Sequence, residues 1–280
     1  MKVVGIDFTS SPSKSKPLTC LNCEFDGIVL RARELVEWRS FEGFDAFLRS
    51  AGPWVAGIDF PFGQASKFIE NIGWPKRWRD YVELVGSIER RVFRATLDEY
   101  RNPRPYGDKE HRRLTDIAAG SISPQKLHGV PVGLMFFEGA PRLLRAEVKV
   151  PGVLDGEPNR IVVEAYPGVL AKRLIGRRSY KNDNSKKQTT DQATARNDLL
   201  GKILNGDCAE DYGFNVEAPF DLCGDPTGDQ LDAILCAMQA AWAWQQRENN
   251  FGAPSGLDPS LEGWIADPTT CAKMNELYKR

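Results

Sequence analysis

The chain has 280 residues, of which 41% are hydrophobic and 27% charged, a composition typical of a globular protein with a sizeable core and not of a disordered or fibrous one. Its 37 lysines and arginines nearly balance its 38 aspartates and glutamates, so net charge alone does not indicate a nucleic-acid partner. No apolar run approaches the ~20 residues of a membrane span, and the start leads into a strand rather than a signal peptide. Because the six cysteines are also scattered, as suits a reducing compartment, we expect a cytoplasmic protein that does not bind a membrane.

The first strand candidate returns almost unchanged further along the chain. Residues 3–8 read VVGIDF and residues 55–60 read VAGIDF, so the two copies carry Asp7 and Asp59 at the same position. Short apolar runs of this kind predict strands that are buried on both faces of a parallel or mixed α/β sheet. Ligands of such sheets bind beyond the carboxyl ends of the strands, where two carboxylates repel each other unless a cation joins them. The repeat therefore predicts a metal site.

Between the two copies the sequence predicts two strands and a helix. Residues 18–25 and 27–38 are strand candidates that follow a polar turn. Ser40 is placed to cap a helix whose aromatic residues share one face. Because a right-handed crossover returns the chain to its sheet, a helix at this point allows the fourth strand to lie parallel beside the first.

Residues 64–128 interrupt the strands and predict a helical insertion. Helical periodicity runs through residues 74–87 and 88–100 and stops at the breaker run NPRP, residues 102–105. Basic and aromatic residues are mixed here, which suits a nucleic-acid backbone but equally suits amphipathic helices with solvated charges. No linker separates two autonomous units, so we expect one domain over residues 1–280 that contains this insertion.

A third acidic strand end follows the insertion. Residues 160–168, RIVVEAYPG, predict a strand that ends at Glu164 and is stopped by the Pro-Gly pair. Residues 172–187 hold seven bases against a single acid, whereas residues 207–267 hold twelve acids against the single base Arg247. The surface is therefore expected to be polarised, with a basic region that either holds phosphates or is simply a solvated face.

The last predicted helix runs from Asp229 to about Gln246 and is apolar around most of its surface. Asp229 and Asp232 are three residues apart and share its first turn. Asp229 follows Gly228 and can cap or complement the helix N-terminus. Asp232 lies between apolar neighbours, where an unpaired carboxylate is costly, so a metal or a basic partner should neutralise it.

The strand-end acids Asp7, Asp59 and Glu164 and the helix acid Asp232 are the groups that a two-metal phosphoryl-transfer centre needs. Phosphodiester hydrolysis requires a nucleophilic water, neutralisation of the transition-state charge and stabilisation of the leaving oxygen, and two Mg²⁺ ions ~4 Å apart supply all three. Carboxylates are the ligands that Mg²⁺ prefers. The chain has two histidines, and neither lies in a recognisable Ser-His-Asp motif.

The sequence resembles the DUF429 proteins, a family of predicted nucleases in the ribonuclease H-like superfamily. The matching segments are GIDFTS at residues 5–10 with the Lys-Pro pair at 16–17, GIDFPFG at 57–63, PVGLM at 131–135, EAYPG at 164–168 and GDQLDA at 228–233. They span nearly the whole chain. The resemblance implies a mixed five-stranded sheet flanked by helices, with the acids of the first and fourth strands side by side.

The last helix is also similar to the final acidic helix of the Holliday-junction resolvase branch, in which two such aspartates complete the metal site. That branch usually carries Glu where this chain has Asp59, and it has no clear counterpart of Glu164. We therefore expect Mg²⁺ or Mn²⁺ to be bound by Asp7, Asp59, Asp232 and Glu164, with Asp7 bridging the metals and Glu164 or Asp229 positioning water.

Three functions fit these residues. The first is a metal-dependent nuclease whose partner is a nucleic acid of unspecified type. The second is an ATP-dependent phosphotransferase of the actin and sugar-kinase group, whose first phosphate loop also reads Gly-x-Asp followed by Thr and Ser; the chain is short for that group and its C-terminal half has no Gly-Gly adenosine loop. The third is a non-catalytic nucleic-acid-binding protein that keeps the acids as remnants, and metal affinity separates it from the first.

Overall fold

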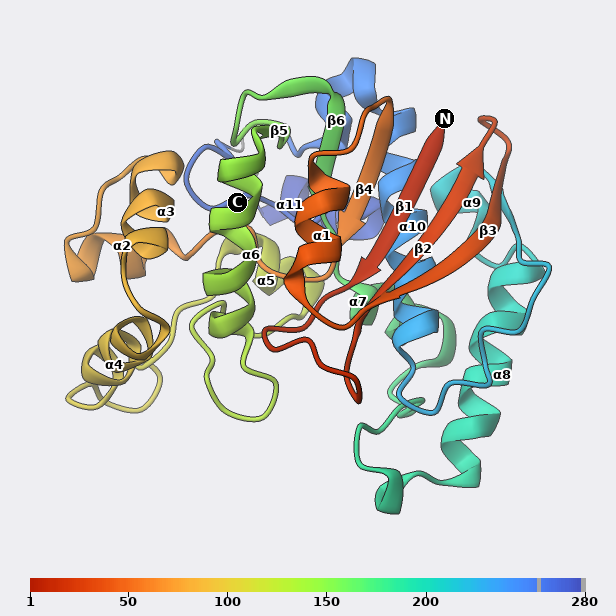
Figure 1. Cartoon of the computed structure of the whole chain (residues 1–280), viewed down its shortest axis with the longest axis horizontal. Coiled ribbons are helices and arrows are strands. Elements are labelled where there is room, and N and C mark those ends of the chain that lie inside the picture. The colour runs from red at the N-terminus through yellow and green to blue at the C-terminus, as the bar shows by residue number, and fades with distance from the viewer. Residues whose placement is uncertain (256–257, 278–280) are drawn as a thin grey trace.

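A computed structural model of the chain describes residues 1–255 and 258–277. Within these residues the strands form one sheet of seven, in the order β5-β6-β4-β1-β2-β3-β7, with helices on both sides (Figure 1). The strands are β1 Lys2–Asp7, β2 Leu18–Phe25, β3 Val29–Trp38, β4 Trp54–Ile58, β5 Val148–Lys149, β6 Glu157–Glu164 and β7 Asn215–Glu217. The sheet is mixed, because β2 is antiparallel to β1 and β3 while β4 and β6 follow β1 in parallel.

The helices are distributed over the whole chain. The α-helices are α1 Phe41–Leu48, α2 Ser66–Ile72, α3 Trp78–Ser87, α4 Arg90–Arg101, α5 Leu114–Ala119, α6 Val132–Ala146, α7 Pro167–Ile175, α8 Thr190–Leu204, α9 Ala209–Tyr212, α10 Asp229–Gln245 and α11 Pro268–Leu277. Two 3₁₀ segments, η1 Ser185–Lys187 and η2 Arg247–Gly252, follow α7 and α10. None of the described helices is both long and apolar enough to cross a membrane.

Strands β1 and β4 pair in the register of the sequence repeat. Gly5 lies opposite Gly57, and the N–H of Asp59 donates to the carbonyl of Ile6 at 3.0 Å. Because the two strands are parallel, Asp7 and Asp59 leave the sheet at neighbouring points of the same edge. The parallel placement that the repeat predicted is confirmed.

Alternation of side chains along the strands separates two cores. Val3 and Val55 face a core that contains α7, α8 and α10, whereas Val4 and Ala56 face a core that contains α1, α3, α4 and α6. In Figure 1, α1 and α6 lie in front of the sheet and α10 lies behind it. The molecule is thus built in three layers, helices on a sheet on helices.

The glycines of the repeat allow α10 to lie directly on the sheet. A Cβ atom added to Gly5 would overlap the carbonyl oxygen of Ala233 and crowd the backbone of Ala237, and one added to Gly57 would overlap the carbonyl oxygen of Cys236. Helix and strand backbones therefore approach more closely than any side chain permits. This contact fixes where the first turn of α10 meets the ends of β1 and β4.

The prediction of a five-stranded sheet is incomplete. The observed sheet gains β5 and β7, of two and three residues, at its two edges. Strands this short have too few residues to show an alternating pattern in the sequence, and they exist only because a longer strand lies beside them. The order of strand, strand, strand, helix, strand over the first part of the chain is confirmed, with Ser40 as the N-cap of α1.

The predicted insertion, residues 64–128, contains α2 to α5, and α2, α3 and α4 lie to one side of the sheet (Figure 1). Helix α3 begins at Trp78 rather than at residue 74, because a proline at 75 disfavours helical geometry in the residue before it. Helix α8 begins at Thr190, with Thr189 and Gln192 in a capping box.

Candidate metal centre

Three aspartates from separate elements converge at the carboxyl edge of the sheet. One carboxylate oxygen from each of Asp7, Asp59 and Asp232 lies within 4.8 Å of the others. Asp7 ends β1, Asp59 directly follows β4, and Asp232 lies in the first turn of α10. Asp7 and Asp232 are buried and Asp59 is partly exposed. The structure therefore brings together three of the four acids that the sequence predicted as metal ligands.

The spacing within the repeat explains this convergence. In each copy, glycine and aspartate are two residues apart, so their side-chain positions face the same side of the sheet. The glycine is the point where α10 touches the strand, and the aspartate lies one step beyond it on that face. Because Asp232 immediately precedes Ala233, which contacts Gly5, helix packing delivers the third carboxylate to the first two.

Asp229 lies in the same first turn of α10 and is also buried. Gly228 is the N-cap residue, so the prediction that the Asp229 side chain caps the helix is wrong. The N–H of Gln230, in the first turn, instead donates a hydrogen bond to Asp225 Oδ2 at 3.3 Å. As a carboxylate in the first turn, Asp229 still complements the positive end of the helix dipole, and it acts electrostatically on Asp7.

A lysine occupies the position of counter-ion to this cluster. The ammonium of Lys181 donates to Asp232 Oδ2 in a direct ion pair, and the hydroxyl of Tyr180 donates to Asp232 Oδ1. The Lys181 side chain is 40% exposed, while Asp232 is almost fully buried. The prediction that Asp232 needs a metal or a basic partner is thus met by a base, Lys181. The sequence could not say which of seven bases it is.

One lysine does not fully compensate the carboxylates around it. Burial and the charge of Asp229 raise the pKa of Asp7 well above its usual range, against the lowering effect of Lys181. Burial and Asp232 raise the pKa of Asp59 to about 7. Burial likewise raises the pKa of Asp229 to about 6. Each of these groups would ionise more readily if additional positive charge were bound among them.

The pKa of Lys181 also reflects the excess of negative charge in this cluster. Burial of its ammonium is the largest single effect and opposes the charged form, but Asp232 and its other neighbours together outweigh burial, and the pKa of Lys181 is raised well above its usual value. Tyr180 and Asp7 act in the same direction. The lysine is therefore held as a cation by the acids that surround it.

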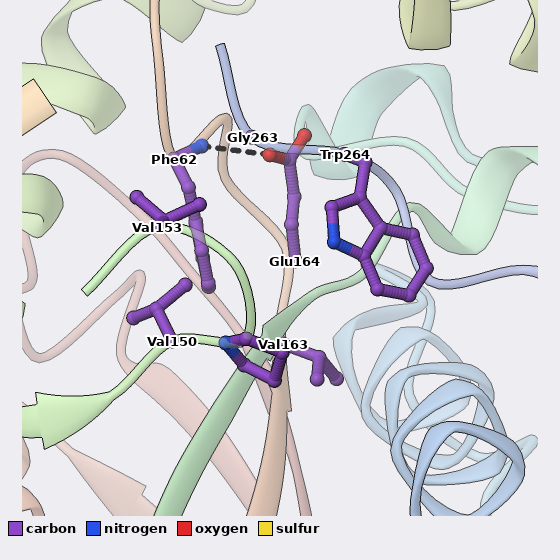
Figure 2. A pocket seen from close by; sticks show the side chains of 8 residues that line it. Phe62, Val150, Val153, Val163, Glu164, Gly263 and Trp264 are labelled. Atoms are coloured by element: carbon purple, nitrogen blue, oxygen red, sulfur yellow. Dashed lines mark hydrogen bonds between the residues drawn. The ribbon is translucent and has the colours of Figure 1, made fainter. Parts of the chain in front are cut away.

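Glu164, the remaining predicted ligand, belongs to a different cluster. It pairs with Ile58 in the parallel register of β4 and β6, one residue before the point that would match Asp59. Its side chain therefore starts from the opposite face of the sheet to the Asp7 and Asp59 side chains. Figure 2 shows the carboxylate directed at the backbone N–H of Phe62, which donates to Oε2 at 2.9 Å, with the indole of Trp264 beside it.

Arg113 holds both oxygens of Glu164 in a buried fork. Its Nη2 and Nη1 atoms lie 2.5 Å from Oε1 and 2.8 Å from Oε2. The same guanidinium donates to both oxygens of Asp116, at 2.9 and 2.8 Å, and to the carbonyl of Glu262 at 3.0 Å. All five N–H donors of Arg113 are thereby used. Neither Arg113 nor Asp116 was predicted as a functional residue, since the pairing of Arg113 with Glu164 is made across the fold.

The pKa values of Glu164 and Arg113 are both raised, but for different reasons. The pKa of Glu164 is raised because burial outweighs the lowering effect of Arg113. The pKa of Arg113 is raised well above its usual range, since Asp116 and Glu164 outweigh its own burial. Arg113 is therefore held as a cation with all of its donors paired, and the fork is a hydrogen-bonded structural unit.

One cavity of about 350 Å³ is lined by members of both clusters. Asp59, Asp232 and Lys181 contribute from the aspartate cluster, and Arg113, Asp116 and Glu164 from the arginine fork. The rest of its lining is mostly apolar and comes largely from the loop after β4, the insertion, the start of α6 and the segment after β6. A molecule bound there would contact Asp59 and Asp232 directly, whereas Asp7 does not line the cavity.

Compared with models of protein families, with curated proteins and with solved structures, the chain gives no match.

Proposed function

We propose that this protein is a nuclease that hydrolyses phosphodiester bonds with Mg²⁺ or Mn²⁺ bound at Asp7, Asp59 and Asp232. The observation that carries the proposal is the convergence of three carboxylates, each from a different element, with oxygens within 4.8 Å of one another. Oxygen ligands of this kind suit hard divalent cations and not thiophilic metals. When bound, the metal ions neutralise the charge that develops on the phosphate and activate the attacking water.

The donor set fits such cations for an electrostatic reason. Burial and mutual repulsion raise the pKa of Asp7 and Asp59, so the cluster lacks positive charge. Asp229, Asp232 and Asp59 all raise the pKa of Asp7, so Asp7 would hold a bound cation amid the other carboxylates. In this proposal Asp229 orients water, while Glu164 supports the loop at Phe62 through its hydrogen bond to that backbone.

The strand order supports a ribonuclease H-like fold. Without the short edge strands β5 and β7, the order is β3-β2-β1-β4-β6, and β2 alone runs against the others. The first and fourth strands of the chain are neighbours and carry Asp7 and Asp59, as the resemblance to the DUF429 family implies. Fold by itself does not establish chemistry, so the proposal rests on the carboxylates.

Cleavage assays with Mn²⁺ test the proposal on single-stranded, duplex and branched DNA and RNA. We expect Asp7→Asn to abolish cleavage, because amide oxygen is a weaker ligand that carries no charge. Glu37→Gln, which removes an exposed carboxylate from β3, serves as the matched control and should cleave as the parent does. Cleavage that survives Asp7→Asn, or that needs no divalent ion, would overturn the assignment. Binding of an ATP analogue with phosphate transfer would favour the phosphotransferase instead.

A further inference from the structure

The cavity next to the aspartates has an apolar wall as well as charged groups. Several of its lining residues are apolar and come from one stretch around the start of α6, namely Val130, Val132 and Met135, joined by Ile122 from the insertion. Val130 is 58% exposed and Ile122 is 40% exposed, so their apolar surface remains open to a ligand. A metal ion or an inorganic phosphate would leave this wall unused.

The arginine in the same cavity cannot serve as a second phosphate site. All five donors of Arg113 are occupied by Asp116, Glu164 and the carbonyl of Glu262. With two carboxylates around one guanidinium, this part of the lining carries no excess positive charge. An anionic group would therefore bind at the aspartates, once they hold metal ions, and the part of the ligand beside Arg113 would be largely uncharged.

The remaining walls suit a flat ring. Tyr166 lies beside Pro167 directly after β6, and Pro61 lies in the loop after β4, so an aromatic ring and two rigid proline rings contribute to the lining. Planar bases stack on such surfaces without regard to their identity. The volume, about 350 Å³, is near the lower end of small-molecule sites, which favours one nucleoside over a stacked series.

We propose that this cavity receives a single nucleobase, that of the nucleotide whose phosphate meets the aspartates. The inference rests on the proposed nuclease function and names its substrate class. A base inside the cavity cannot be paired in a duplex, so the substrate presents an unpaired nucleotide at a chain end, in a loop or flipped out of a helix. Uninterrupted duplex is excluded from the productive position.

Calorimetric titration of the full chain tests the inference without relying on catalysis. In the presence of Mn²⁺, we expect adenosine 5′-monophosphate to bind about tenfold more tightly than ribose 5-phosphate, a difference of about 1.4 kcal/mol. Octyl phosphate, an apolar but non-planar ligand, should bind more weakly than the mononucleotide. Adenosine alone, titrated without metal, should bind weakly to the same cavity.

Two surface variants localise the effect. Val130→Asp places a charge on the exposed apolar wall and should remove the tenfold advantage of the mononucleotide, while the affinity for ribose 5-phosphate stays unchanged. Val92→Asp, the matched control, alters a residue of α4 that is 42% exposed and absent from the cavity lining, and should keep the advantage. Neither residue is buried, so neither change should unfold the protein.

The outcomes separate this inference from the proposed function. If Mn²⁺ binds but ribose 5-phosphate or octyl phosphate equals the mononucleotide, the base assignment fails and the nuclease proposal stands. If Mn²⁺ does not bind, the nuclease proposal fails, whereas metal-free adenosine binding that is lost in Val130→Asp still supports the cavity as a base site. Absence of adenosine binding in that case would overturn both.

Discussion

The molecule contains two buried clusters of charge that line one cavity and differ in how completely they are compensated. In the arginine fork, Arg113 places all five donors on Asp116, Glu164 and a backbone carbonyl. In the aspartate cluster, the one ion pair that Lys181 forms within the described residues is with Asp232, and Asp7 and Asp59 repel the carboxylates around them. A compensated cluster holds a structure together, whereas an uncompensated one has affinity left for a ligand.

This difference means that acidity and burial are poor guides to function when taken alone. Glu164 is more deeply buried than Asp59 and also ends a strand, yet both of its oxygens already accept hydrogen bonds from Arg113. What distinguishes Asp7 and Asp59 is that no donor within the described residues hydrogen-bonds to their carboxylates, and the third candidate ligand, Asp232, is held by Tyr180 and by the partly exposed Lys181. Four changes, in order of decreasing expected effect, test this division between a structural and a functional cluster.

Removing the arginine should be the most damaging change. Arg113→Met leaves Asp116 and Glu164 buried without a partner and should lower the free energy of unfolding by about 3–5 kcal/mol. Urea denaturation of the metal-free protein measures the loss. Arg113→Lys keeps the charge but not the planar fork, so we expect an intermediate loss. A change below about 1 kcal/mol in Arg113→Met would show that the fork is not structural.

Removing an aspartate should have the opposite signature. Asp7→Asn relieves repulsion among buried carboxylates, so the metal-free protein should be as stable as the parent or more so. Its affinity for Mn²⁺, measured by calorimetry, should fall by about 100-fold or more, since even outer-shell changes cost about 10–100-fold. A variant that loses stability and retains Mn²⁺ affinity would place Asp7 among the structural acids.

Removing the lysine should favour the metal. Lys181→Met deletes the ammonium that pairs with Asp232, so Mn²⁺ meets no competing cation and its affinity should rise by about tenfold, or about 1.4 kcal/mol. The metal-free variant should in turn be less stable, because Asp232 loses its partner. Lys186→Met, at an exposed position of the same basic segment, is the control and should change neither quantity. Unchanged affinity in Lys181→Met would mean that lysine and metal do not share Asp232.

The smallest expected effect is a pH dependence. The pKa of Asp59 is raised to about 7 in the folded chain, so the folded state binds the proton more tightly than the unfolded state. The free energy of unfolding of the metal-free protein should therefore fall as pH rises from about 4 to about 7, and Asp59→Asn should reduce that slope. Mn²⁺ binds the ionised form, so its affinity should be about fourfold higher at pH 8 than at pH 6.5 through Asp59 alone. Affinity that is independent of pH would contradict the raised pKa.

Much of the aspartate cluster could be predicted from residues close together in the sequence. The repeat carried a glycine and an aspartate at the same spacing in both copies, and pairing in register placed Asp7 beside Asp59. An acid within the apolar helix α10 required a partner wherever the helix lay. These are consequences of strand periodicity, helix periodicity and the cost of burying charge, which the local sequence determines.

The tertiary structure alone decided which acids are free to bind. Glu164 is separated from the cluster because β6 pairs with β4 at a register that turns its side chain to the other face, and register depends on contacts with a distant strand. In the sequence, nothing distinguishes Lys181 from the other six bases of its segment. The fold does so, because the loop after α7 brings Lys181 to Asp232 of α10. Arg113 meets Glu164 across 51 positions of sequence. Charge compensation is a property of three-dimensional neighbours, so the sequence supplied the carboxylates and the fold determined which of them remain uncompensated.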